Sequence, residues 1–234
     1  LGKFVVLGLL GMAVYQSLAY YAAALTSATN MGIILSLMPL MSLGLASSIL
    51  AHRLNAGALL GALVSLAGVV LVISQGHLGA LLEHGVNLGD AMMIVATLAY
   101  AVYSVLLKKW SLKLPAMQLL YLQVLVAILA LLPLYLLSPR TGLNAANLPM
   151  VLYAALFASI VAALAWMHGV ARLGPSRMAL FFNLLPIITA CIATLVLGER
   201  LTVHHLVGGA LTLAGVLLAE FWQRRPARLR SATC

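Results

Sequence analysis

The sequence predicts an all-α polytopic membrane protein, and its composition, hydropathy and apolar run lengths carry that prediction. Hydrophobic residues make up 64% of the 234 positions and charged residues only 7%, and the mean hydropathy is +1.13. A soluble domain needs about a quarter of its residues charged to cover its surface, so most of this surface must face lipid. The apolar runs have the length of helices, unlike the alternating strands of a membrane barrel, which are about ten residues long.

Hydropathy divides the chain into eight expected membrane spans. They are residues 4–24, 28–50, 56–74, 89–107, 116–137, 149–170, 175–197 and 203–222. Asp90, at the start of the fourth, is expected to cap that helix. The longest connection, 75–88, is rich in glycine and is predicted to link two halves of the protein.

The basic residues fall mainly on one side of the expected membrane. One face collects 11 of the 13, and the other collects only Arg140 and Arg200. The positive-inside rule places the rich face, with the C-terminal tail, in the cytoplasm. The net charge of +9 is therefore mostly an orientation signal. Nucleic acid is not an expected partner, because no aromatic or base-reading element accompanies the tail, whereas the lipid bilayer and a small molecule are.

An offset of 147 residues aligns two parts of the sequence. Residues 19–71 and 166–218 share 15 identities in 53 positions without a gap, and Pro39 aligns with Pro186. The matching spans are an odd number of spans apart, so the two copies have opposite orientations in the membrane. Inverted repeats of this kind are typical of secondary transporters, whose binding sites lie near the midplane between the halves.

The repeat sets the expected domain organisation. It comprises the last three helices of a first unit (1–74), a linker (75–88), five helices of a second unit (89–222) and a basic cytoplasmic tail (223–234). The offset places the counterparts of helices 89–107 and 116–137 before Leu1. We therefore expect a ten-helix parent of which eight helices are present here, and a protein of eight helices is the alternative.

The stretches SLMPLMSLGLASSILAHRL and NLLPIITACIATLVLGERL, residues 36–54 and 183–201, resemble paired EamA repeats of the drug/metabolite transporter superfamily. The mid-span proline, the Gly-Glu-Arg-Leu ending and the Gly-rich helix that follows are the most specific features. The resemblance covers nearly the whole chain and implies a bacterial inner-membrane permease, often an exporter of amino acids or related metabolites. The first copy departs from the pattern at His52, where the second has Glu199.

Pro39 and Pro186 lie near the middle of their spans, where each removes a backbone hydrogen bond. In lipid, the carbonyl freed four residues earlier must contact protein or a watery cavity. Ser36 and Asn183 occupy the same repeat position and could satisfy these carbonyls or contact a substrate. The two prolines are expected to form paired hinges at a central cavity, and a packing kink is the alternative.

Polar side chains at mid-span depth usually face the interior of a helix bundle. The expected substrate contacts are Gln16, Ser36, Tyr100, Tyr103, Ser159 and Asn183. Helix–helix hydrogen bonding is the alternative for each of them. As a set they predict a polar, uncharged cavity with aromatic walls. Trp166 lies nearer a helix end and is expected in the interfacial aromatic belt.

Two further groups of residues have structural interpretations. Arg53, Glu199 and Arg200 are expected to end helices at the membrane surface. Small-residue stripes run along the third and eighth spans, and such stripes allow close helix packing. They consist of Gly61, Ser65 and Gly68, and of Gly208, Thr212 and Gly215. A homodimer formed on these stripes is the lesser alternative.

The sequence has no motif for catalysis, for a cofactor or for a metal. It lacks the phosphate-binding GxxxxGK[ST] loop, the zinc-binding HExxH motif and the nucleophile elbow. Cys191 and Cys234 show no disulfide or metal spacing. The predicted function is secondary-active export of small metabolites such as amino acids. A truncated, nonfunctional transporter remnant and an intramembrane enzyme are the alternatives.

Overall fold

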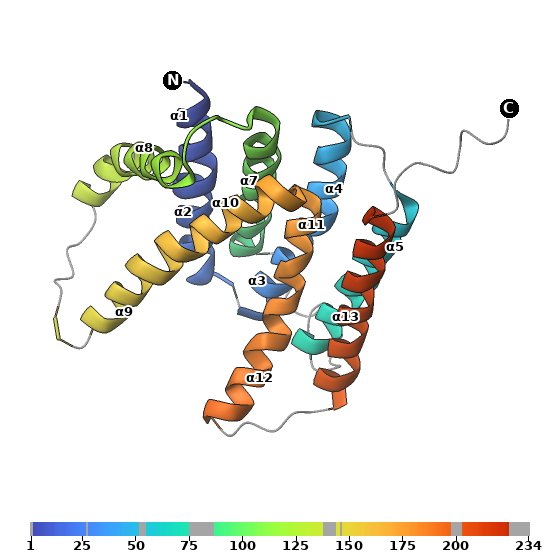
Figure 1. The fold of residues 1–234 in the computed structure, drawn as a ribbon. Helices are drawn as coiled ribbons and strands as arrows, with labels where there is room; N and C mark the ends of the chain where they lie inside the picture. Colours follow the sequence, from blue (N-terminus) through green and yellow to red (C-terminus); the bar gives the residue numbers. More distant parts are fainter. Residues whose placement is uncertain are drawn as a thin grey trace, which may run out of the picture.

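The computed structural model describes residues 2–26, 28–51, 55–74, 87–137, 144–145, 147–197 and 203–224, in which all regular structure is helical (Figure 1). Arg53, Glu199 and Arg200 lie outside the described residues, as do most of the expected linker and of the basic tail. The predictions for these segments therefore stay predictions.

All eight expected spans are helical, and we number them in chain order. Span 1 consists of α1 (Gly2–Gly8), η1 (Leu9–Val14) and α2 (Tyr15–Ala23), span 2 of α3 (Ala28–Leu35) and α4 (Met38–Ile49), and span 3 of α5 (Ala56–Ser74). Spans 4 and 5 are α7 (Leu88–Trp110) and α8 (Ala116–Leu137). Span 6 consists of α9 (Leu148–Tyr153), η2 (Ala154–Val161) and α10 (Ala162–Leu173). Span 7 consists of α11 (Pro175–Leu180), η3 (Phe181–Leu184) and α12 (Leu185–Leu197), and span 8 is α13 (Val203–Arg224).

The lengths of these helices match a bilayer. The 23 residues of α7 extend about 34 Å at 1.5 Å per residue, slightly more than the hydrocarbon core of about 30 Å. Within the described residues, six spans are long and apolar enough to cross a membrane, and spans 3 and 7 contain the shorter apolar helices Ala56–Val72 and Pro175–Ile188. The fold is that of a multi-pass helical membrane protein.

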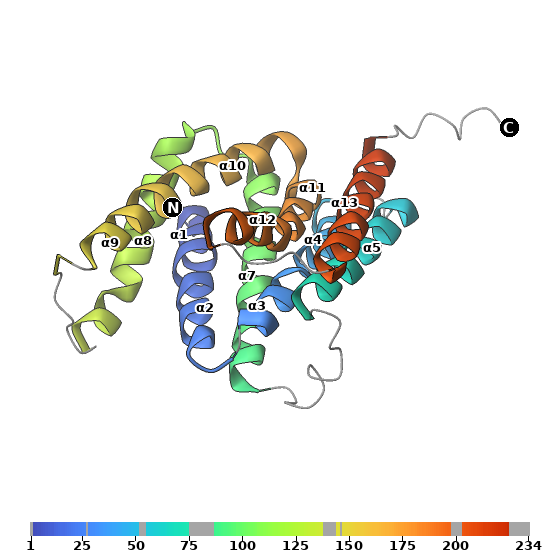
Figure 2. The same ribbon diagram turned by 90° about the horizontal axis from the view of Figure 1, so that it is seen from below.

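The helices form a bundle with α7 near its centre (Figures 1 and 2). Spans 3 and 8 lie side by side at one end, whereas α8 and α9 lie at the other. The main apolar core contains buried side chains from spans 1, 2, 4, 5, 6 and 7, among them Leu7, Met38, Tyr103 and Trp166. This core holds the central spans together.

The start of α7 is fixed by a capping box. Asn87 is the N-cap, and its side-chain oxygen accepts a 2.8 Å hydrogen bond from the Asp90 backbone N–H. In return, the Asp90 carboxylate accepts a 3.1 Å bond from the Asn87 backbone N–H. The cap expected at Asp90 is therefore shared, because Asn87 takes the N-cap position and Asp90 the N3 position. Thr26 and Asn30 also donate to this carboxylate, which ties the connection between spans 1 and 2 to span 4.

The 147-residue offset also relates irregular parts of the helices. Residues 9–14 of span 1 are π-helical, and the offset carries them to 156–161, inside the π-helical segment Ala154–Val161 of span 6. The chain makes a turn at Ser36 and Leu37 in span 2, and the equivalent residues end the 3₁₀ segment Phe181–Leu184 in span 7. The two halves thus share local distortions as well as sequence.

Spans 3 and 8 pack through their glycines, and the contacts obey the repeat. A Cβ atom added to Gly61 would lie 2.4 Å from the backbone nitrogen of Ala219. At the repeat-related positions, a Cβ atom added to Gly208 would lie 2.7 Å from Cγ2 of Val72. The 147-residue offset relates Gly61 to Gly208 and Val72 to Ala219. The second contact is therefore the first one with the two halves interchanged.

A second pair of contacts follows the same rule. A Cβ atom on Gly68 would lie 2.5 Å from the backbone nitrogen of Thr212, and one on Gly215 would lie 2.3 Å from that of Ser65. Residue numbers rise along α5 as those of their partners fall along α13, so the helices are antiparallel, as inverted copies require. The stripes face each other within the chain, as the packing interpretation predicts, so a homodimer would have to use another surface.

Two neighbouring glycines of α13 test this contact. In Gly208→Ala the new methyl group would meet Val72 and the carbonyl oxygen of Gly68, and such overpacking costs about 1–3 kcal/mol. We expect a lower Tm for this variant in detergent. Gly209→Ala is the matched control, because its added methyl group would have no atom closer than 3.8 Å. Equal Tm values for the two variants would contradict the tight contact.

Candidate functional site

A cavity of about 790 Å³ lies between spans 1, 4, 5, 6 and 7. Its size lies within the range of small-molecule sites, roughly 300–1,000 Å³. It is lined by Gly11, Met12, Tyr15, Gln16, Tyr100, Val124, Ala127, Ile128, Leu131, Leu132, Tyr135, Ala158, Ser159, Ala162, Ala163, Trp166 and Phe182. None of these lining residues carries a charged side chain.

The cavity lies near the middle of the spans. Tyr100 is close to the centre of α7 (Leu88–Trp110), about 15–18 Å from either end at 1.5 Å per residue. The lining residues of span 1 belong to the junction of η1 and α2, and those of span 6 to the junction of η2 and α10. This is the depth at which transporters built from inverted repeats bind their substrates.

The repeat relates two parts of the lining residue by residue. Span 1 contributes residues 11, 12, 15 and 16, and span 6 contributes 158, 159, 162 and 163 together with Trp166, which has no lining counterpart on span 1. Every member of the first set is separated from its counterpart in the second by the same 147 residues. The cavity therefore lies between the two halves, at equivalent places on both.

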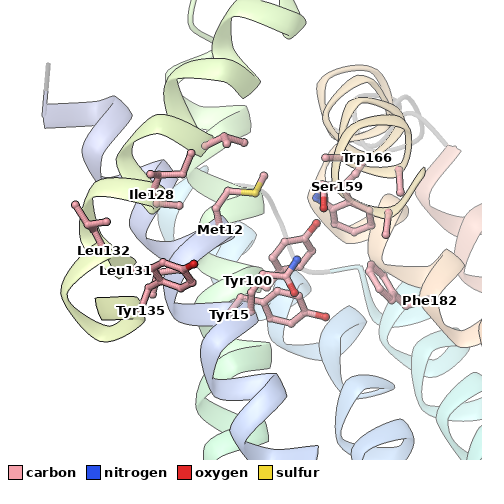
Figure 3. A pocket seen from close by; sticks show the side chains of 17 residues that line it. Met12, Tyr15, Tyr100, Ile128, Leu131, Leu132, Tyr135, Ser159, Trp166 and Phe182 are labelled. Atoms are coloured by element: carbon pink, nitrogen blue, oxygen red, sulfur yellow. The ribbon is translucent and has the colours of Figure 1, made fainter. Parts of the chain in front are cut away.

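Aromatic rings form one side of the cavity around Tyr100 (Figure 3). The centroid of the Tyr100 ring lies 4.4 Å from that of Tyr15, 5.3 Å from those of Tyr103 and Trp166, and 6.3 Å from that of Phe182. Trp166 and Phe182 are 4.9 Å apart in an edge-to-face arrangement. Aromatic pairs in this range attract each other beyond their burial, so the rings support one another.

Trp166 differs from its expected place in an interfacial belt. Its side chain is 7% exposed, lines the cavity and belongs to the main core. Its indole nitrogen Nε1 is buried without a hydrogen-bond partner among the described residues. Tryptophan in an interfacial belt keeps its polar edge at the headgroups, whereas this ring is enclosed. Its position in the sequence gave no signal for the cavity.

The opposite side of the cavity, on α8, is aliphatic apart from the phenol ring of Tyr135. Figure 3 shows Ile128, Leu131 and Leu132 on α8, across from Tyr15 and Tyr100. Val124 and Ala127 extend the same face of α8. We call Val124, Ala127, Ile128, Leu131 and Leu132 the aliphatic wall, and Tyr15, Gln16 and Tyr100 the polar wall. The cavity therefore offers apolar contact along α8, whereas its polar groups come from the polar wall, from Ser159 and Trp166 on span 6 and from Tyr135 on α8.

Three of the predicted substrate contacts line the cavity, namely Gln16, Tyr100 and Ser159. The Gln16 side chain is exposed, so its amide is available to a ligand. The hydroxyl group of Ser159 donates a 2.9 Å hydrogen bond to the carbonyl oxygen of Ala154 in its own helix. Tyr103 is buried directly behind Tyr100, with its ring against Gly11.

Ser36 and Asn183 are buried and are not among the lining residues. The Ser36 hydroxyl donates a 2.6 Å bond to the Ile33 carbonyl oxygen. Asn183 Nδ2 donates a 3.0 Å bond to the Ser65 hydroxyl oxygen, joining span 7 of one half to span 3 of the other. Among the described residues, the side-chain oxygen of Asn183 has no partner.

The 3₁₀ turn before Pro186 supplies a hydrogen bond to the backbone carbonyl that the proline leaves without its usual donor. The Phe182 carbonyl, freed by the proline, accepts a hydrogen bond from the Leu185 N–H instead. The 3₁₀ geometry of Phe181–Leu184 makes this closer bond possible. Asn183 is therefore not needed for that carbonyl, and its amide joins helices instead.

Metal ligands do not gather in the described part of the chain, which holds no group of three or more His, Cys, Asp or Glu side chains that could bind an ion. The cavity is instead suited to an uncharged or hydrogen-bonding organic molecule held by phenol, amide and indole groups.

A helical membrane protein built of inverted halves with a midplane cavity between them has the architecture of a secondary transporter. The family model described as the EamA-like transporter family matches residues 1–74 and 87–221. The chain therefore belongs to the EamA-like transporter family.

Similar proteins carry transporter names. The chain is 29% identical over 224 residues to an uncharacterised transporter, YyaM, of Bacillus subtilis (strain 168), covering 93% of this chain and 72% of the relative. It is 27% identical over 227 residues to a probable terminal-alkyne amino-acid exporter of Streptantibioticus cattleyicolor, covering 97% of this chain and 74% of the relative. Family and relatives alike indicate a transporter rather than an enzyme.

A solved crystal structure supports the fold. It superposes with a TM-score of 0.77 at 19% sequence identity, covering 94% of this chain and 76% of the other. At this identity the likeness speaks for the arrangement of helices and not for a shared substrate.

The bond between Asn183 and Ser65 makes a testable contribution to stability. Asn183→Ala and Ser65→Ala should each lower the free energy of unfolding by about 1–3 kcal/mol, because each leaves a buried polar group unpaired. The double variant should lose less than the sum, with a coupling of about 1 kcal/mol. Equilibrium unfolding in mixed micelles measures all three values.

Ser74→Ala, on the same helix α5 as Ser65, supplies the control for this double-mutant comparison. The Ser74 hydroxyl is buried without a partner among the described residues, so its removal should add to Asn183→Ala without coupling. A coupling of zero between Asn183 and Ser65 would show that the bond contributes nothing.

Proposed function

We propose that this protein is a secondary-active transporter that binds its substrate in the cavity between spans 1, 4, 5, 6 and 7. The observation that carries the proposal is the repeat-related lining, residues 11, 12, 15 and 16 opposite 158, 159, 162 and 163. A site placed equivalently on two inverted halves can be exposed to either side of the membrane by equivalent movements. Family membership supports the same conclusion.

The proposed movement uses the shared distortions of the spans. Pro39 and Pro186 follow the breaks in spans 2 and 7, where fewer regular backbone hydrogen bonds resist bending. We assign them as paired hinges. The π-helical segments Leu9–Val14 and Ala154–Val161 carry lining residues on spans 1 and 6. A rotation at either segment would therefore change the shape of the cavity directly.

The proposed substrates are small metabolites such as amino acids, and the proposed direction is export. The name of the Streptantibioticus relative supports both points. Gln16, Tyr100 and Ser159 are assigned as substrate contacts in the present arrangement. Ser36, Tyr103 and Asn183 are assigned as contacts that a rearranged cavity would reach, because they are buried behind its walls.

The proposed location is the bacterial inner membrane, with the C-terminal tail in the cytoplasm. The distribution of basic residues, 11 on one face and two on the other, supports this orientation. The ends of α7 and α10 on the basic-rich face carry Lys108 and Arg172. The Lys108 ammonium donates to the Ala171 carbonyl oxygen, so this charge also joins the two helices.

Transport by the reconstituted chain is the direct test. Purified protein in liposomes should exchange at least one labelled compound from a panel of amino acids and related metabolites, above protein-free liposomes. Tyr100→Ala should lower that rate at least about tenfold, because it removes ring contacts worth roughly 0.5–1.5 kcal/mol each. Tyr100→Phe, which keeps the ring, should retain more of the rate.

Tyr121→Ala is the matched control for this loss. Tyr121 is on α8, is 65% exposed and does not line the cavity, so its variant should transport normally. A panel in which no compound moves would contradict the proposal and favour a nonfunctional remnant. Equal losses for Tyr100→Ala and Tyr121→Ala would remove the cavity from the mechanism.

Orientation can be read from Cys234, the last residue of the tail. In a Cys191→Ser background, a membrane-impermeant maleimide should label Cys234 in inverted vesicles and leave it unlabelled in intact spheroplasts. The reason is that the tail is expected on the cytoplasmic face. Labelling in intact spheroplasts alone would reverse the proposed orientation.

A further inference from the structure

Gln123 of α8 carries a buried amide that the described residues leave without a partner. Its side chain is 0% exposed, and neither Nε2 nor Oε1 makes a hydrogen bond within the part of the chain that the structure describes. The hydroxyl group of Tyr103 on α7 is also enclosed and also has no partner there. Burying such groups unpaired lowers stability, so packing alone does not explain their presence.

The two side chains are neighbours, and span 1 packs directly on both residues through glycines. The Gln123 side chain lies close to the Tyr103 hydroxyl group. A Cβ atom on Gly8 would lie 2.8 Å from the carbonyl oxygen of Gln123, and one on Gly11 would lie 2.8 Å from the Tyr103 ring. A phenol donates a single hydrogen bond, whereas the amide Nε2 has two N–H groups that a phenol acting as donor would leave unused. We call Tyr103 and Gln123 the buried polar pair.

The buried polar pair lies just outside the cavity. Ala127, one turn beyond Gln123 on α8, lines the cavity, as does Tyr100, one turn before Tyr103 on α7. Positions four apart on a helix of 3.6 residues per turn differ by only about 40° in direction. Gly11 lines the cavity and also packs on the Tyr103 ring. The backbone of span 1 at Gly11 thus stands between the cavity and the pair.

This part of span 1 has an irregular backbone. Gly11 belongs to the π-helical segment Leu9–Val14, and π-helical turns are frequent at functional sites. Conversion of such a turn to α-helix shifts the register by one residue, which turns side chains by about 100°. A shift of this kind would move Gly11 off the Tyr103 ring and open the pair to the cavity.

We infer that Tyr103 and Gln123 form a latent part of the binding site, which joins the cavity when span 1 shifts at its π-helical segment. In that state the phenol and the amide Nε2 donate hydrogen bonds to an acceptor oxygen of the transported compound. This inference rests on the proposed function, because it adds Gln123 to the contacts of a rearranged cavity. The amide of Gln123 therefore contributes to transport and not to the stability of the closed state.

Thiol labelling of the full chain in detergent tests the opening without requiring transport. In a Cys191→Ser/Cys234→Ser background, Gln123→Cys should react with 2-hydroxyethyl methanethiosulfonate at least about tenfold faster than Leu119→Cys, because only the pair opens locally. Leu119 is the matched control, since it is 5% exposed and lies one turn before Gln123 on α8. Equal labelling rates would overturn the opening.

A second glycine pair links that opening to span 1. Gly11→Ala should raise the labelling rate of Gln123→Cys severalfold, because its methyl group would lie 2.8 Å from the Tyr103 ring in the closed state. Gly44→Ala is the control, because its methyl group would have no atom within 4 Å. The same rate in both backgrounds would show that span 1 does not cover the pair.

Gln123→Met separates binding from stability, since methionine keeps the length of the side chain and removes its amide. The Tm in detergent should not fall, whereas transport of the compound identified in liposomes should fall at least about fivefold, as expected for one lost hydrogen bond. A lower Tm would show that the amide is already paired in the closed state, for example with bound water, and would overturn the latent role. Transport at the unchanged rate would overturn the contact with the transported compound.

Failure of the proposed function would give a different pattern. If no compound moves, that function falls and the pair loses its proposed ligand, whereas the labelling rates and the Tm still decide whether the pair opens. Transport together with equal labelling rates for Gln123→Cys and Leu119→Cys would do the reverse, leaving the transporter and removing the latent site.

Discussion

The close contact between α5 and α13 is the constraint on which the arrangement of the two halves depends. In a bilayer, helices gain little from hiding apolar surface, because lipid is as apolar as their side chains, so association depends on close packing and interhelical hydrogen bonds. Gly61, Gly68, Gly208 and Gly215 allow this approach. The bond from Asn183 to Ser65 adds a polar link between halves beside the same contact. With spans 3 and 8 joined in this way, the equivalent surfaces of spans 1 and 6 both line one cavity.

The cavity in turn depends on aromatic packing. Tyr100 touches rings from spans 1, 4, 6 and 7, so it determines how closely these spans approach at the midplane. The aliphatic wall and Tyr135, all on α8, line the opposite side. Symmetry therefore explains the position of the cavity, whereas side chains that break the symmetry explain its chemistry.

Much of this fold could be predicted from the sequence, because lipid makes helix-length apolar runs easy to identify. The eight spans, the inverted repeat and the packing of the small-residue stripes all followed from residue types and their spacing. The direction in which mid-span side chains face did not. Gln16 and Asn183 have similar depth, yet one lines the cavity and the other is buried between helices. Trp166 was expected at the interface and is enclosed instead. Hydropathy gives the depth of a residue but not the rotation of its helix, and π-helical or 3₁₀ turns alter the usual period of 3.6 residues.

The paired π-helical segments also bear on the history of the chain. A π turn holds more residues than an α turn, so a span that contains one has a shifted register on its far side. Leu9–Val14 and the repeat-related part of Ala154–Val161 have this shift at the same place, although few of their side chains agree. The simplest origin is a single length change in an ancestral unit, before that unit was duplicated and the copies took opposite orientations. The backbone irregularity has thus outlasted most of the side chains that first accompanied it.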